Sequence, residues 1–146
     1  MIDSAVATRL RPFGETTGGL QRPAQHLMGM IMPFNLEEEL AQLCQEVSWK
    51  SGDRNAKTLV KQGATRVVLT VMKAGARIDD HRAPGEVIIQ ALGGHLRVTT
   101  EGQVIDLPSG HLLALAPNVA HDVEALVESA FLLTIHWPGV DGLWQS

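Results

Sequence analysis

Two histidines in the second half of the sequence, His81 and His121, combine residue type and setting in a way that could support chemistry. Each lies next to a proline-containing turn, Pro84-Gly85 after His81 and Pro117-Asn118 before His121. A neutral imidazole can bind a divalent transition metal or hydrogen-bond a small molecule. Two imidazoles suit iron, manganese, nickel and zinc equally and hold each of them weakly, because functional sites normally supply three protein ligands. A metal site and a metal-free pair lining a cavity are therefore both open.

The other reactive side chains have simpler interpretations. His95 and His111 follow glycines at the starts of predicted strands and face outward by strand parity, while His136 closes the last predicted strand. We expect these three at the surface or at an interface, because histidine is seldom fully buried. His26 falls in a segment without a recognisable pattern and has no interpretation. Cys44 lies on the apolar stripe of a predicted helix, which favours a buried small hydrophobe over a reactive thiol.

The first third of the chain divides into an irregular arm and one helix. Residues 1–33 contain scattered prolines and glycines without periodicity. Within them, the cluster 27–32 is apolar enough to lie on the rest of the folded domain or on a neighbouring subunit. Asn35, with a glutamate three residues later, matches an N-cap and its capping-box partner, and apolar residues at helical spacing then predict a helix over about 36–47. We expect a single barrel domain over residues 34–140.

Short runs rich in β-branched residues, separated by glycine and proline turns, predict an all-β fold after residue 50. Many short strands at close spacing, without helices between them, indicate an antiparallel sandwich or barrel. The predicted strands are 58–60, 66–72, 87–92, 96–100, 104–107, 112–115 and 130–135.

Composition limits the partners and the compartment. At 146 residues the chain suits one domain with a hydrophobic core. Its formal net charge of −4 offers no basic surface to a phosphate backbone, so we expect no nucleic-acid partner. The apolar run 112–116 stops at Pro117, far short of the roughly 20 residues that a membrane span needs. Together with a single cysteine, these features predict a cytoplasmic protein without membrane contact.

A first spacing frame surrounds His81. Gly75 is followed by five residues and His81, then by Ala83, three residues, Val87, six residues and Gly94. A second frame surrounds His121.

In the second frame Gly110 is followed by five residues and Ala116, then by Asn118, two residues, His121, three residues and Ala125. Asn118 stands where a turn requires positive φ, which asparagine accepts better than most residues.

The two frames resemble the paired motifs of the cupin superfamily. The first family motif is Gly, five residues, His-x-His, three or four residues, Glu, six residues, Gly, and the second is Gly, five residues, Pro-x-Gly, two residues, His, three residues, Asn. The resemblance covers roughly residues 58–136 and is closest to small single-domain members of the cupin 2 conserved-barrel type. It implies an antiparallel double-stranded β-helix, the jelly-roll barrel.

The resemblance also implies a site in which three histidines and one carboxylate hold a divalent metal. Here Ala83 and Val87 replace one histidine and the carboxylate, so His81 and His121 remain. Glu86 is a substitute ligand if a bulge turns it inward, but strand parity otherwise points it to solvent.

Val87, Ile89 and Ala91 would continue the interior row and make the cavity apolar, which suits an apolar or aromatic small molecule. Three functions therefore stay open: a barrel that binds a small molecule, and in which a divalent metal is an optional component, without the usual cupin dioxygenase chemistry; a metal-dependent oxygenase or isomerase with a reduced two-histidine site; and a structural module with a closed barrel.

Several predicted strands are apolar on both faces, for example at Ile88 beside Val87 and Ile89. A strand that is apolar on both faces must be covered on both. Because one small barrel has a single core, the second cover is another subunit, the N-terminal arm or the predicted helix. We expect a homodimer, since twofold dimers are the commonest solution.

Overall fold

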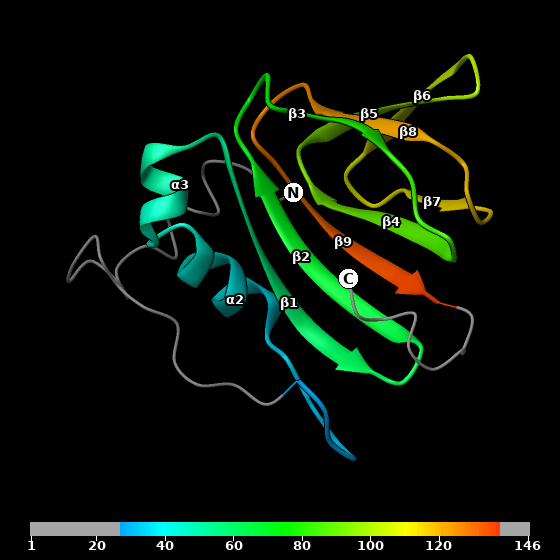
Figure 1. Ribbon diagram of the computed structural model, residues 1–146. Helices are drawn as coiled ribbons and strands as arrows, with labels where there is room; N and C mark the ends of the chain where they lie inside the picture. The colour runs from blue at the N-terminus through cyan, green and yellow to red at the C-terminus, as the bar shows by residue number, and fades with distance from the viewer. Residues whose placement is uncertain (1–26, 138–146) are drawn as a thin grey trace.

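Two antiparallel sheets form the body of the described structure, and its two helices lie on the outer face of one sheet (Figure 1). The computed structural model describes residues 27–137. Within them, a five-stranded sheet has the order β1-β2-β9-β4-β7 and a four-stranded sheet the order β3-β8-β5-β6. The strands are β1 Arg54–Gln62, β2 Thr65–Met72, β3 Arg77–His81, β4 Glu86–Gly93, β5 His95–Thr100, β6 Gln103–Pro108, β7 Leu112–Leu115, β8 His121–Ala125 and β9 Ser129–His136.

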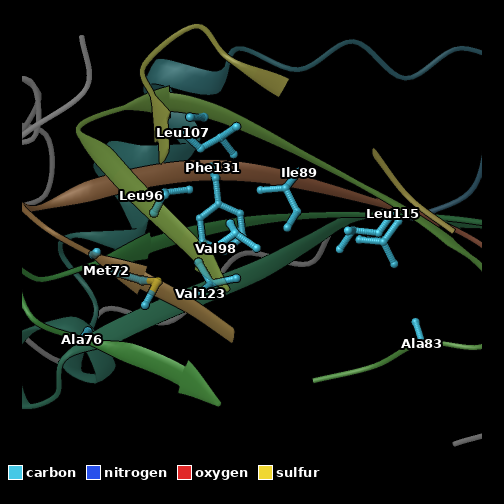
Figure 2. Packing of buried hydrophobic residues seen from close by; sticks show 13 residues of the cluster. Met72, Ala76, Ala83, Ile89, Leu96, Val98, Leu107, Leu115, Val123 and Phe131 are labelled. Carbon is cyan, nitrogen blue, oxygen red and sulfur yellow. The ribbon is translucent and has the colours of Figure 1, made fainter. Parts of the chain in front are cut away.

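The main hydrophobic core lies between the two sheets (Figure 2). Its side chains come from alternating positions of the strands, because successive strand residues point to opposite faces. On β4, for example, Val87, Ile89 and Ala91 are buried, whereas Ile88 and Gln90 are exposed. The predicted interior row of β4 and the all-β antiparallel class are confirmed. The core residues are Met72, Ala76, Ala83, Val87, Ile89, Ala91, Leu96, Val98, Leu107, Leu115, Val123, Ala125 and Phe131.

Two helices replace the single helix predicted over 36–47. They are α2, Leu36–Leu43, and α3, Val47–Ser51. The predicted N-cap is confirmed, since Asn35 Oδ1 accepts hydrogen bonds from the backbone N–H groups of Glu37 and Glu38. The predicted C-terminal end is wrong, because the Asn55 side chain donates to the Leu43 carbonyl and ends α2 there.

A second core lies between these helices and the outer face of β1, β2 and β9. It contains Leu40, Leu43 and Trp49 from the helices, and Cys44 packs against it half-buried. Beside it, the ammonium of Lys57 lies 2.5 Å from Glu39 Oε1 and 2.8 Å from Gln42 Oε1. This interaction attaches α2 to β1.

All seven predicted strands are present, most of them longer than predicted, and two further strands appear. These are β3 and β8, which pair with each other in the four-stranded sheet. Of the N-terminal arm predicted over 1–33, residues 27–33 are described, and His26 lies outside the described residues. No helix in the described part of the chain is long and apolar enough to cross a membrane.

Candidate functional site

His81 and His121 lie side by side on neighbouring strands. His81 ends β3 and His121 begins β8, and the two are direct partners in the antiparallel ladder. Their ring centroids are 5.4 Å apart with an angle of 86° between the planes, an edge-to-face arrangement. The structure therefore brings together the two histidines that were selected from the sequence.

The His121 ring is fixed in its orientation. The residue is buried, with 3% of its surface exposed, and Nδ1 lies 3.1 Å from the backbone oxygen of Val119. Because a carbonyl oxygen can only accept a hydrogen bond, Nδ1 carries the proton and donates it. In the neutral ring Nε2 then keeps its lone pair, so this nitrogen can accept a hydrogen bond or bind a cation.

His81 stands at the exposed rim of the same site. Its pKa is lowered from the ordinary value, mainly because the imidazole is partly removed from water and further because a positive charge on His121 opposes a second one. At neutral pH the His81 ring is therefore neutral, and it can donate and accept one hydrogen bond each.

A turn before β8 connects the two motif regions. Asn118 has φ +65°, the left-handed conformation that the sequence predicts at this position. Its backbone N–H donates to the Ala83 carbonyl at 2.8 Å, and its own carbonyl accepts from Arg82 Nη1 at 3.4 Å. On the other side, Thr100 Oγ1 donates to the Ala120 carbonyl at 2.8 Å. These contacts join the turn before His121 to the segment that follows His81 and to β5.

Apolar side chains occupy the two positions where the cupin motif has ligands. Ala83 and Val87 are buried, with 6% and 3% of their surfaces exposed, and both belong to the main core. The turn between them keeps close contact with β9, since a Cβ at Gly85 would lie 1.8 Å from the His136 carbonyl oxygen. The interior positions next to the histidines therefore carry no metal-binding group.

Glu86 is exposed on β4, opposite His136 of β9 in the ladder. Within residues 27–137, no group of three or more His, Cys, Asp or Glu side chains is placed to hold a metal ion. The cupin donor set is thus not reproduced by the described residues, because two imidazoles fall short of the usual three protein ligands. The role of His81, His121 and Glu86 as metal ligands stays a prediction.

The core is closed at one end and accessible at the other. Figure 2 shows Phe131 surrounded by neighbouring core side chains, whereas Ala83 and Leu115 lie at the far end. Along β9, the inward-facing Phe131 is buried but Leu133 and Ile135 are half-buried. The half-buried apolar side chains packed against the core are Ile78, Leu113, Val119, Leu133 and Ile135. Half-buried Arg66 is the ladder partner of Ile135 and lies on the same face of the sheet.

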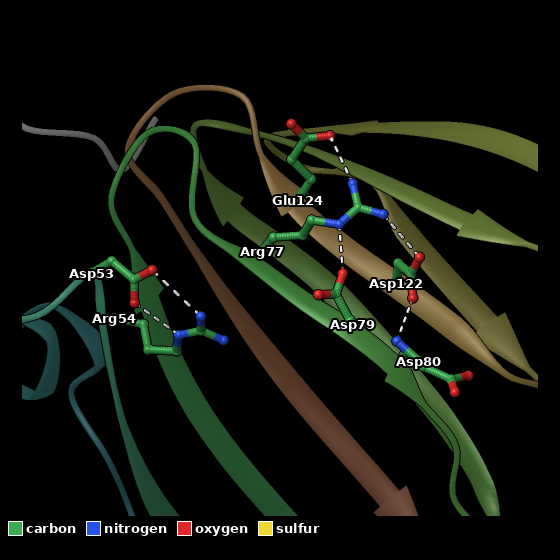
Figure 3. A network of polar contacts seen from close by, with 7 residues as sticks. All are labelled: Asp53, Arg54, Arg77, Asp79, Asp80, Asp122 and Glu124. Carbon is green, nitrogen blue, oxygen red and sulfur yellow. Dashed lines mark hydrogen bonds and ion pairs between the residues drawn. The ribbon is translucent and has the colours of Figure 1, made fainter.

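An exposed polar cluster on the opposite face of β3 and β8 holds these two strands together (Figure 3). Arg77 on β3 lies 2.5 Å from Asp79, 3.0 Å from Asp122 and 3.7 Å from Glu124. The hydrogen bond and charge of Asp79 raise the pKa of Arg77. Asp122 also accepts a hydrogen bond from the backbone N–H of Asp80. Sequence reasoning missed this cluster, although alternating charge in β8 was a usable signal.

The remaining described histidines lie away from the site. His111 and His136 are exposed, in agreement with the surface or interface positions predicted for them. His95 is half-buried on β5, with Nε2 3.6 Å from Asp106 Oδ1.

Two face-to-face antiparallel sheets, with both motif histidines at the accessible end of the barrel, define a small protein of the cupin superfamily. A family model described as the AraC-like ligand-binding domain matches residues 65–143, from β2 onward. The chain belongs to this family. No curated protein matches the sequence significantly.

Solved structures share the fold at low sequence identity. A cupin superfamily protein from Desulfitobacterium hafniense is 16% identical with a TM-score of 0.57, over 58% of this chain and 78% of that one. A cupin 2 conserved-barrel protein from Leptotrichia buccalis is 24% identical with a TM-score of 0.56, over 58% and 41%. A salicylate 1,2-dioxygenase from Pseudaminobacter salicylatoxidans is 15% identical with a TM-score of 0.55, over 57% of this chain and 26% of that protein. These likenesses describe the fold.

Proposed function

We propose that this protein binds a small organic molecule at the accessible end of the barrel, with His81 and His121 as its polar contacts, and that it does so without the usual cupin dioxygenase chemistry. The observation that carries the proposal is the replacement of two ligand positions by buried Ala83 and Val87 directly beside an intact histidine pair. Membership of a ligand-binding family supports the same conclusion.

The chemistry of the site indicates the class of ligand. The half-buried lining contributed by Ile78, Leu133 and Ile135 is apolar, so it favours an apolar or aromatic body. The imidazole of His121 presents one acceptor nitrogen, and neutral His81 can donate or accept. A molecule with an aromatic or aliphatic body and a hydroxyl group that donates to His121 Nε2 would satisfy both parts.

A binding experiment tests this proposal. The full chain is screened by thermal shift against benzoate, 4-hydroxybenzoate, octanoate and a neutral monosaccharide, and each hit is measured by isothermal titration calorimetry. We expect one-to-one binding of 4-hydroxybenzoate that weakens about tenfold in His121→Ala, because the ligand hydroxyl loses its buried acceptor. Benzoate and octanoate, which carry no hydroxyl donor, should bind more weakly than 4-hydroxybenzoate. His111→Ala is the matched control, since His111 is exposed and lies outside the site.

Elemental analysis of the same preparations separates this proposal from the metal-enzyme alternative. The metal-enzyme alternative would be favoured over our proposal by two results together: stoichiometric transition metal that disappears in a His81→Ala and His121→Ala double variant, and turnover of a substrate. If Glu86 completes such a site, Glu86→Gln must lower the metal content as well. Absence of binding to every probe, combined with a lowered melting temperature in Ile135→Phe, would instead favour a closed structural barrel, because a packed interior has no room for the larger ring.

A further inference from the structure

An arginine stands on the inner face of the five-stranded sheet. Arg66 lies near the start of β2 and is the ladder partner of Ile135 on β9 and of Lys61 on β1. Directly paired residues of an antiparallel ladder project to the same face of the sheet. Because Ile135 packs against the main core, the half-buried side chain of Arg66 also projects to the inner face. A positive charge is therefore built into the apolar lining.

The ladder row of Arg66 leads to the histidine site. From Ile135 the row continues to Val87 on β4 and to Leu115 on β7, which lies at the accessible end of the core (Figure 2). Val87 occupies the position at which the cupin motif carries a carboxylate ligand. The backbones of Arg66 and Val87 are two strand spacings apart, about 10 Å. The arginine thus stands across the accessible end from the motif position, at a separation that a small molecule can span.

Trp137 lies against one face of the guanidinium. Cζ of Arg66 is positioned over the Trp137 ring, 5.7 Å from its centroid. The backbone N–H of Trp137 donates to the Ala64 carbonyl at 2.7 Å, which holds the indole beside the start of β2. Contact with a ring uses the face of the planar guanidinium, whereas its five N–H donors lie in the plane. Five donors allow this group to bind a carboxylate in addition to other contacts, through two parallel hydrogen bonds.

The charges in this row favour a negative ligand. Lys61 is exposed on the edge strand β1 and, as the ladder partner of Arg66, lies on the same face of the sheet. The three other members of the row are apolar: Ile135, Val87 and Leu115. Two neighbouring cations without an acidic residue in the row raise the local positive potential, which attracts an anion.

We propose that Arg66 binds a carboxylate of the ligand and makes the protein selective for hydroxycarboxylic acids whose two polar groups are separated by an apolar body. This assignment rests on the proposed function, in which His121 accepts the ligand hydroxyl and the apolar lining contacts the body. Arg66 supplies the contact at the other end. Its forked donors match the two oxygens of a carboxylate, and such charge-assisted hydrogen bonds are roughly twice as strong as neutral ones.

A comparison of an acid with its neutral amide tests this selectivity on the unaltered full chain. Isothermal titration calorimetry at neutral pH measures 4-hydroxybenzoate and 4-hydroxybenzamide, which share the ring and the hydroxyl. We expect the acid to bind at least about tenfold more tightly, because only the acid offers a carboxylate to the arginine. Equal affinities, or a preference for the amide, would overturn the role of Arg66 while the hydroxyl contact to His121 still stands. No binding of either compound would overturn the proposed function and this assignment with it.

Substitution of Arg66 tests whether this residue causes the preference. Arg66→Gln is expected to weaken the acid about tenfold and to leave the amide unchanged, whereas His121→Ala should weaken both ligands. Arg66→Lys should bind the acid with intermediate affinity, because it keeps the charge but loses the forked donors.

The matched control is Arg97→Gln, which removes the same charge from an exposed position on the outward face of β5 and should keep both affinities. Melting temperatures without ligand establish that each variant is folded, and if Arg66→Gln is not, Arg66→Lys and the acid–amide comparison decide. A preference for the acid that survives in Arg66→Gln, or an equal loss of both ligands in that variant, would contradict a carboxylate contact at Arg66.

Discussion

His81 and His121 face each other across the β3–β8 ladder with ring centroids 5.4 Å apart. The pair occupies two of the four ligand positions in the cupin motif, and the other two are filled by buried alanine and valine. The protein thus keeps the frame that places the ligands while lacking half of them. This relationship predicts that restoring the two missing side chains would complete a four-ligand metal site.

Ala83→His combined with Val87→Glu is expected to give a protein that binds one divalent transition metal per chain. The two new side chains complete a set of three imidazoles and one carboxylate at inward-facing positions. Elemental analysis and the melting temperature with and without chelator measure the gain.

The control for this gain is Ala83→His with Ile88→Glu, which places the carboxylate on the outward face of the same strand. Equal metal content in the control and the designed variant would show that the inward positions do not converge on one site.

Stability should fall on acidification because of His81. Its pKa in the folded protein lies below the ordinary value of 6.5, so the unfolded chain binds the proton more readily. The stabilising effect of a neutral His81 is complete above pH 6.5 and is lost progressively as the pH falls through the lowered folded-state pKa. Urea unfolding between pH 8 and pH 5 measures this decline, and His81→Gln is expected to flatten it. An unchanged slope in that variant would assign the decline to other groups.

Asn118→Ala should destabilise the protein by about 1 kcal/mol, the cost of a left-handed residue with a Cβ. Asn118 has φ +65° and its backbone N–H holds the Ala83 carbonyl, a bond that every substitution except proline retains. Asn118→Gly should be close to the parent protein because glycine accepts positive φ freely. Denaturant unfolding ranks the three proteins, and equal losses in both variants would indicate a role for the asparagine side chain instead.

Glu39→Ala is expected to cost about 3 kcal/mol of stability, because it leaves the ammonium of Lys57 buried without its countercharge. The Lys57 side chain is 4% exposed and lies 2.5 Å from Glu39. Lys57→Met should cost less, since a methionine of similar length can pack under α2 without a charge. Chemical denaturation of both single variants and of the double variant measures the coupling. A larger loss in Lys57→Met than in Glu39→Ala would contradict this view of the pair.

The barrel class and most strands could be predicted from the sequence, but the strands that carry the candidate site could not. The β3 segment Arg-Ile-Asp-Asp-His and the β8 segment His-Asp-Val-Glu-Ala contain few residues with high β propensity. In β8, however, His121, Val123 and Ala125 are buried and alternate with half-buried acids. Period-two alternation was therefore present where propensity was weak, and it is the better signal for such strands.

The break between α2 and α3 was not predictable because it depends on a distant side chain. Asn55 on β1 donates to the Leu43 carbonyl and to Glu46 Oε1, and this tertiary contact ends the helix before its apolar pattern ends. Buried polar residues on β1 itself, Asn55 and Lys57, explain why the first part of this strand was not predicted from apolar runs. The residue spacing around His81 and His121 did predict that the two histidines lie together. This spacing is kept even where Ala83 and Val87 replace two of the motif's ligands.

The position of β3 at the edge of its sheet has a consequence for ligand exchange. In the described structure β3 pairs with β8 through Arg77, Ile78 and His81, with an irregularity before His81. An edge strand attached by so few pairs is among the least protected parts of a barrel against local opening. If such an opening carries His81 away from buried His121, entry and escape of a bound molecule should follow it, and fast amide exchange near His81 would be its measurable sign.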